Sequence, residues 1–180
     1  MNRSHYFAWL LLCVWAVWLC AFSGYLVQFA GLGHWAPQLS IALFVALAAR
    51  IPASEIPKLA LTIGFARVAV SIDTPAAVLA SALSLGVLLR LARTAIQVES
   101  PVISAALAFL ACTLESAWLE AMHLRTEPTL SQGWSSVEFA WPAGITTALV
   151  TAVFGGVLAN LPGLGNLIRR KSWAVGASLR

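Results

Sequence analysis

Three charged side chains stand inside or beside apolar stretches that are long enough to cross a bilayer. Arg67 lies within one stretch, Asp73 follows it at a break, and Glu115 lies within a later stretch. A charge that faces lipid costs about 3 kcal/mol on insertion scales, so both intramembrane charges should face a bundle interior or find partners. Our leading hypothesis pairs Arg67 with Glu115 or with Asp73. The alternative is that the long side chain of Arg67 extends to the outer interface.

Buried arginine and glutamate residues also occur on proton and ion paths. Few further polar residues stand within the apolar stretches to continue such a path. Glu115 and Glu120 are five positions apart, which separates them by about 140° around a helix and does not suit a catalytic pair of carboxylates. The charges are therefore interpreted as structural.

The remaining reactive side chains are scattered along the chain. The histidines are His5, His34 and His123, and the cysteines, which lack C-x-x-C spacing, are Cys13, Cys20 and Cys112. The sequence contains no H-E-x-x-H, G-x-S-x-G or Walker motif and no glycine-rich phosphate loop. We predict no catalytic residue, no metal site and no cofactor, and hence a protein that is not an enzyme.

Composition determines the class of elements that must hold these charges. The 180 residues are 60% hydrophobic and 10% charged and include eight tryptophans, and the mean hydropathy is +0.85. Such a chain is expected to be an integral membrane protein. At this length roughly six helices of about 20 residues fill the chain, which leaves no room for a soluble catalytic domain. The expected fold is all-α, a polytopic single bundle of about six transmembrane helices over residues 1–180.

Apolar runs separated by proline and glycine give the approximate helices. We expect helices at residues 7–29, 38–50, 59–72, 75–93, 102–122 and 139–161, followed by a basic tail at 162–180. The second run is short, so it spans with its flanks, tilts, or is shielded by its neighbours.

The basic residues predict the orientation of the chain. With the N-terminus in the cytoplasm, Arg125 falls outside and Arg67 within the membrane, which leaves nine of the 11 lysines and arginines on the inside. Both termini are therefore expected in the cytoplasm. Arg169, Arg170 and Lys171 are interpreted as a topology anchor, with anionic lipid or a cytoplasmic filament as alternative partners. The net charge of +4 arises mostly at helix ends and does not indicate nucleic acid.

Small side chains are frequent in the run at 75–93. Ala76 and Ala80 form one small-x-x-x-small pair, and Ala77 and Ser81 form another. Such pairs let helices approach closely, so we predict that this helix packs inside the bundle or against a partner.

The order of several features resembles a known membrane protein family. The residues concerned are Pro37, Gly64-Phe65, Asp73 with Pro75, and Arg90 with Arg93. In this order they resemble the family of the rod shape-determining protein MreD. The resemblance implies a non-enzymatic subunit of the elongation machinery in the bacterial inner membrane. It also implies an MreC-like protein, the MreB filament, RodA and a penicillin-binding synthase as partners.

The MreD family is also similar in architecture to the substrate-binding subunits of energy-coupling-factor transporters. That similarity implies an alternative function, a membrane subunit that binds a vitamin or a metal for transport. Such a subunit would have an outward cavity and would dock a transmembrane coupling protein through small-residue faces.

Overall fold

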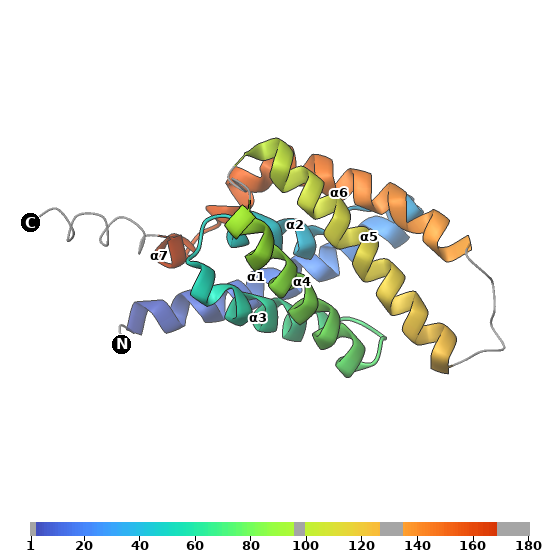
Figure 1. Ribbon diagram of the computed structural model, residues 1–180, viewed down its shortest axis with the longest axis horizontal. Coiled ribbons are helices and arrows are strands. Elements are labelled where there is room, and N and C mark those ends of the chain that lie inside the picture. Colours follow the sequence, from blue (N-terminus) through green and yellow to red (C-terminus); the bar gives the residue numbers. More distant parts are fainter. Residues whose placement is uncertain (1–2, 96–99, 127–134, 169–180) are drawn as a thin grey trace, which may run out of the picture.

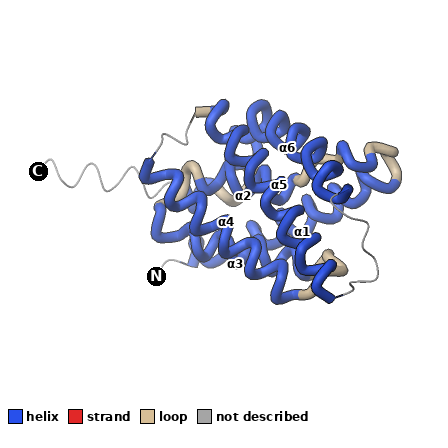
Figure 2. The backbone as a smooth tube through the Cα atoms, turned by 45° about the vertical axis from the view of Figure 1, so that its right-hand side comes forward, coloured by secondary structure: helices blue, strands red, loops and turns tan. Residues whose placement is uncertain are grey.

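The computed structural model describes residues 3–95, 100–126 and 135–168, and every regular element in these ranges is helical (Figures 1 and 2). The elements are α1 (Arg3–Gln28), η1 (Gly33–Trp35), α2 (Leu39–Ala48), η2 (Ala53–Glu55), α3 (Ile56–Val68), α4 (Pro75–Ala95), α5 (Pro101–Thr126), α6 (Ser135–Ala159) and α7 (Gly165–Ile168). The expected all-α class is thus observed, with six main helices. Arg169, Arg170 and Lys171 lie outside the described residues.

Four of the helices are long and apolar enough to cross a membrane. Their apolar portions are Tyr6–Gln28, Pro75–Ala95, Pro101–Met122 and Ala140–Ala159, which have 20 to 23 residues each. At about 1.5 Å per residue these lengths match the roughly 30 Å of a hydrocarbon core. The chain therefore has the character of a helical membrane protein. The shorter helices α2 and α3, with 10 and 13 residues, do not reach this length, so four of the six expected transmembrane helices have spanning length in the described residues.

The short helix α2 is the centre of the bundle. All ten of its residues are buried, and it packs against α1, α3, α5 and α6. Figure 1 shows it behind α4 and α5, with long helices to either side. Its continuous apolar sequence explains this position, because a helix that is apolar on every side is stable only where neighbours cover it. Of the possibilities weighed for this short run, the structure shows shielding by neighbours.

Hydrogen bonds connect the two ends of α2 to three other helices. At its start, the backbone N–H of Gln38 donates to Thr147 Oγ1 of α6 at 2.9 Å and that of Leu39 donates to Ser23 Oγ of α1 at 3.1 Å. At its end, the guanidinium of Arg93 from α4 donates to the carbonyl oxygens of Ala48 and Ile51. A buried helix leaves polar backbone groups at both ends, so these contacts stabilise α2 where water does not reach.

The helix α3 begins earlier and ends earlier than the predicted run at 59–72. Pro57 lies in its first turn rather than breaking it, because the first N–H groups of a helix need no partner within the helix. At the other end, the N–H groups of Ala69 and Ser71 close the last turn on the carbonyl groups of Phe65 and Arg67. The chain then turns through residues 69–74 into α4. In the segment expected as a tail, residues 165–168 form the short helix α7.

Glycines bring α3 and α4 into close contact. A Cβ added at Gly86 of α4 would lie 2.8 Å from the Cβ of Ala60, and one added at Gly64 of α3 would lie 3.0 Å from that of Ala82. The first distance is shorter than carbon atoms tolerate, and the second is tighter than most carbon contacts. The two backbones therefore cross at a spacing that glycine permits, as small residues do in other membrane bundles.

We predict that Gly86→Ala lowers the free energy of unfolding by about 1 to 3 kcal/mol, because the new methyl group would force α3 and α4 apart. Reversible unfolding in mixed detergent micelles would measure the change. Gly24→Ala in α1 is the matched control, since a Cβ there meets nothing within 4 Å. Equal stability of the two variants would contradict a close α3–α4 crossing.

Candidate functional site

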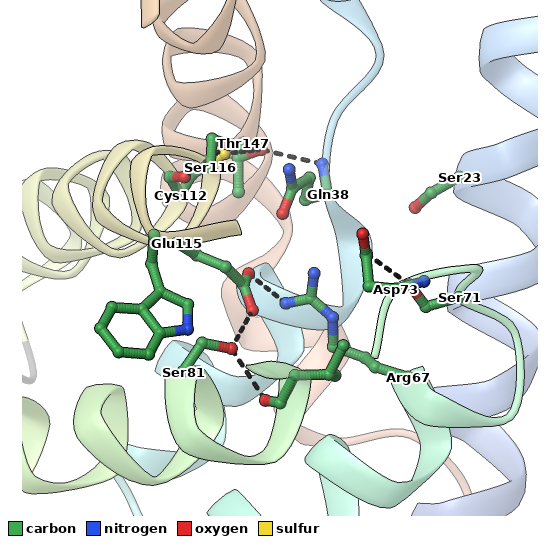
Figure 3. Close-up of polar contacts among 12 residues, drawn as sticks. Ser23, Gln38, Arg67, Ser71, Asp73, Ser81, Cys112, Glu115, Ser116 and Thr147 are labelled. Atoms are coloured by element: carbon green, nitrogen blue, oxygen red, sulfur yellow. Dashed lines mark hydrogen bonds and ion pairs between the residues drawn. The ribbon is translucent and has the colours of Figure 1, made fainter. Parts of the chain in front are cut away.

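The structure brings Arg67 and Glu115 together inside the bundle. Arg67 lies in the last turn of α3, and its Nη1 forms an ion pair with Oε2 of Glu115 from α5. The other carboxylate oxygen, Oε1, accepts a hydrogen bond from Ser81 Oγ of α4 at 3.0 Å. Figure 3 shows the three side chains pointing toward one another from three helices. One carboxylate thus links α3, α4 and α5.

Burial makes this contact important for stability. The side chain of Glu115 is 1% exposed and that of Arg67 is 16% exposed. A carboxylate so far from solvent has its charge compensated by the guanidinium, and its remaining oxygen shares the Ser81 hydroxyl with the carbonyl oxygen of Val78, which is 2.8 Å away. Removing one member of such a buried pair leaves an uncompensated charge, which typically costs about 3 to 5 kcal/mol.

Asp73, the other partner considered for Arg67, lies in the turn between α3 and α4. The carboxylate of Asp73 accepts a hydrogen bond from Ser71 Oγ. The backbone N–H of Asp73 donates to Ser71 Oγ in return, at 3.1 Å. The carbonyl group of Thr74 accepts the first hydrogen bonds of α4, from Ala77 and Val78. Asp73 therefore orders the turn that leads into α4, whereas Glu115 neutralises Arg67.

The four small residues predicted for packing do not share one environment. Ala77 and Ser81 are buried, Ala80 is partly buried, and Ala76 is exposed. The carbonyl group of Ala77 also accepts a hydrogen bond from Trp118 Nε1 of α5 at 3.1 Å. The row through Ala77 and Ser81 is thus the one that contacts α5.

The charged groups of the network are engaged with one another. Both oxygens of Glu115 are engaged, and the guanidinium of Arg67 is permanently charged at physiological pH. In the described ranges, no group of three or more His, Cys, Asp or Glu side chains is placed to hold a metal ion. The arrangement can hold helices together.

A separate cavity of about 440 Å³ lies where α1 ends and α2 begins. Its polar lining includes Ser23, His34, Gln38, Ser116 and Glu120. Gln38 Oε1 is buried and, within the described residues, has no hydrogen-bond partner. This cavity has the size and the polar groups of a small-ligand pocket.

The sequence did not predict the hydrogen bonds that Ser81 and Arg93 form with other helices. Ser81 was selected only for its small size, and its bond to Glu115 depends on how α4 turns relative to α5. Arg93 was read as part of a basic helix end, whereas it binds the carbonyl groups of Ala48 and Ile51. A signal for Arg93 exists in retrospect, because a short apolar helix such as α2 needs donors near its C-terminus.

The chain matches no family model, no curated protein and no solved structure. The interpretation of the site therefore rests on the chemistry and placement of its own residues.

We predict that Arg67→Leu lowers the free energy of unfolding by about 3 kcal/mol or more, because Glu115 is left charged and buried without its partner. Unfolding in mixed micelles would measure the loss. Arg90→Leu is the matched control, since Arg90 lies exposed on α4. If both variants lost the same small amount of unfolding free energy, the contact between Arg67 and Glu115 would not contribute to stability.

Proposed function

We propose that this protein is a non-enzymatic scaffold subunit of the machinery that directs rod-shaped growth in bacteria. In this role it links an MreC-like protein and the peptidoglycan synthase, with its RodA component, to the cytoplasmic MreB filament. The observation that carries the proposal is the closed network of Arg67, Glu115 and Ser81. The buried charges are used to join helices, which suits a rigid membrane scaffold better than a transport path.

The residues that resemble the MreD family lie in one part of the bundle, which supports the proposal. Pro37 leads into α2, Gly64 allows α4 to approach α3, and Arg93 binds the C-terminal end of α2. Asp73 orders the turn between α3 and α4. Each of these positions thus has a physical role in assembling α2, α3 and α4.

The proposed location is the bacterial inner membrane, with both termini in the cytoplasm. Arg50 and Lys58 flank the connection from α2 to α3, and the contact of Arg93 with Ala48 and Ile51 brings the end of α4 to the same side. Basic residues concentrate on the cytoplasmic side of membrane proteins. This cluster of positive charge favours that orientation.

The second candidate is the substrate-binding subunit of a vitamin or metal transporter. The cavity lined by His34, Gln38 and Glu120 favours it, because it lies at the end of the bundle that the proposed orientation places outside. The buried Oε1 of Gln38 would accept a hydrogen bond from a ligand there.

Affinity purification of the full chain in mild detergent distinguishes the two functions. We expect an MreC-like protein and the wall-synthesis enzymes to co-purify from a rod-shaped host, because the scaffold acts through these contacts. Mass spectrometry would identify the proteins, and an unrelated tagged membrane protein of similar size serves as the control. Recovery of an ATPase module with a bound small molecule, and of no wall-synthesis protein, would refute the scaffold function.

A further inference from the structure

A second cavity lies at the opposite end of the bundle from the one lined by His34. It has a volume of about 390 Å³ and lies between the end of α2, the start of α5, the end of α6 and α7. Figure 1 shows these element ends on the side of the bundle where α7 lies. Its lining includes Arg50, Ser104, Thr151, Gly155 and Gly156.

The guanidinium of Arg50 distinguishes this cavity from a packing defect. Two other partly buried arginines have acceptors, since Arg67 pairs with Glu115 and Arg93 binds two backbone carbonyl groups. Arg50 is also partly buried and lines the cavity, yet its side chain has no hydrogen bond or ion pair to any residue that the structure describes. Among the residues that the structure describes, the cavity lining contains no carboxylate. A positive charge held in this position is suited to an anion from outside the chain.

The glycines of α6 keep the cavity open. A Cβ added at Gly155 would lie 3.8 Å from the Cβ of Ala46, and one added at Gly156 would lie 3.7 Å from Nη2 of Arg50. Both are ordinary contacts, so close packing of helices does not require glycine here. At Gly144 of the same helix, by contrast, an added Cβ would lie 2.9 Å from the ring of Phe109. The effect of Gly155 and Gly156 is to leave space beside Arg50.

Two hydroxyl groups add a second kind of polar contact. Ser104 Oγ donates to the carbonyl group of Pro101 at 3.0 Å, and Thr151 Oγ1 donates to that of Thr147 at 2.7 Å. Because each hydroxyl gives its proton to its own helix, its oxygen atom remains available as an acceptor. The cavity thus combines a cation for an anionic group with acceptors for donor groups.

We propose that this cavity binds a phosphate ester that also carries hydroxyl groups, and that its source is the headgroup of an anionic lipid such as phosphatidylglycerol. The phosphate accepts hydrogen bonds from Arg50, and the glycerol hydroxyls donate to Ser104 and Thr151. The cavity lies at the ends of the membrane-length helices α5 and α6, the level at which headgroups are found. A soluble phosphate ester has the same chemistry, so the experiment separates the two sources.

The test measures the thermal stability of the full-length protein in neutral detergent micelles. Dioleoyl phosphatidylglycerol, dioleoyl phosphatidylcholine or sodium phosphate is added in separate titrations. We expect phosphatidylglycerol to raise the Tm of the wild type, and phosphatidylcholine and phosphate to have little effect. Arg50→Gln should weaken the apparent affinity for phosphatidylglycerol by about fivefold, which corresponds to roughly 1 kcal/mol for one basic residue at a headgroup.

Two further variants separate binding from folding. Gly156→Met fills the cavity without removing a charge and should reduce the effect of phosphatidylglycerol, whereas Arg90→Gln removes an exposed cation of α4 and should leave it unchanged. If Arg50→Gln does not fold, the lipid site is tested with Gly156→Met and with native mass spectrometry of lipid bound to the wild type.

The outcomes of the test are distinct. Sodium phosphate could instead raise the Tm as much as the lipid does, with the rise lost in Arg50→Gln. That result would support a phosphate site that binds soluble esters and would refute the lipid as its source. Equal effects of phosphatidylglycerol on the wild type, Arg50→Gln and Gly156→Met would overturn the site, as would no selectivity over phosphatidylcholine in the wild type.

Discussion

A polar group inside this bundle is costly unless it has a partner, because neither lipid nor an apolar interior offers one. Two sets of contacts meet this constraint. The backbone ends of α2 bond to Ser23, Thr147 and Arg93, and the carboxylate of Glu115 bonds to Arg67 and Ser81. An unsatisfied polar group in such surroundings costs several kcal/mol. These contacts therefore select one arrangement of helices from the many that apolar packing alone would allow.

The same constraint explains why a helix of ten residues lies at the centre of longer ones. α2 is too short to cross a membrane alone, and its surrounding helices provide both the apolar cover and the polar groups at its ends. Glycines at positions 64 and 86 bring α3 and α4 close, and α4 carries both Ser81 and Arg93. α4 thus connects the buried ion pair to the end of the buried helix. The proposed scaffold function rests on this joining of the helices.

Hydropathy and helix-breaking residues were enough to predict an all-α chain and the approximate places of its six main helices. The cost of isolated charges in lipid was enough to propose Arg67 and Glu115 as partners. The rotation of each helix could not be predicted, because small residues line several faces of α4, and the sequence does not show that Ala77 and Ser81 are the ones that bond to α5. For the same reason Arg50 and Arg93 could not be told apart by sequence. One lines a cavity and the other binds backbone carbonyl groups.

The central claim is that Arg67 and Glu115 stabilise the bundle through each other. A double-mutant cycle in mixed micelles, with Arg67→Leu, Glu115→Leu and the double variant, measures this coupling directly. We expect the double variant to be more stable than the sum of the single losses implies, by about 2 kcal/mol, because it leaves no unpaired charge in the interior. Additive losses would contradict the account, since each residue would then act independently of the other.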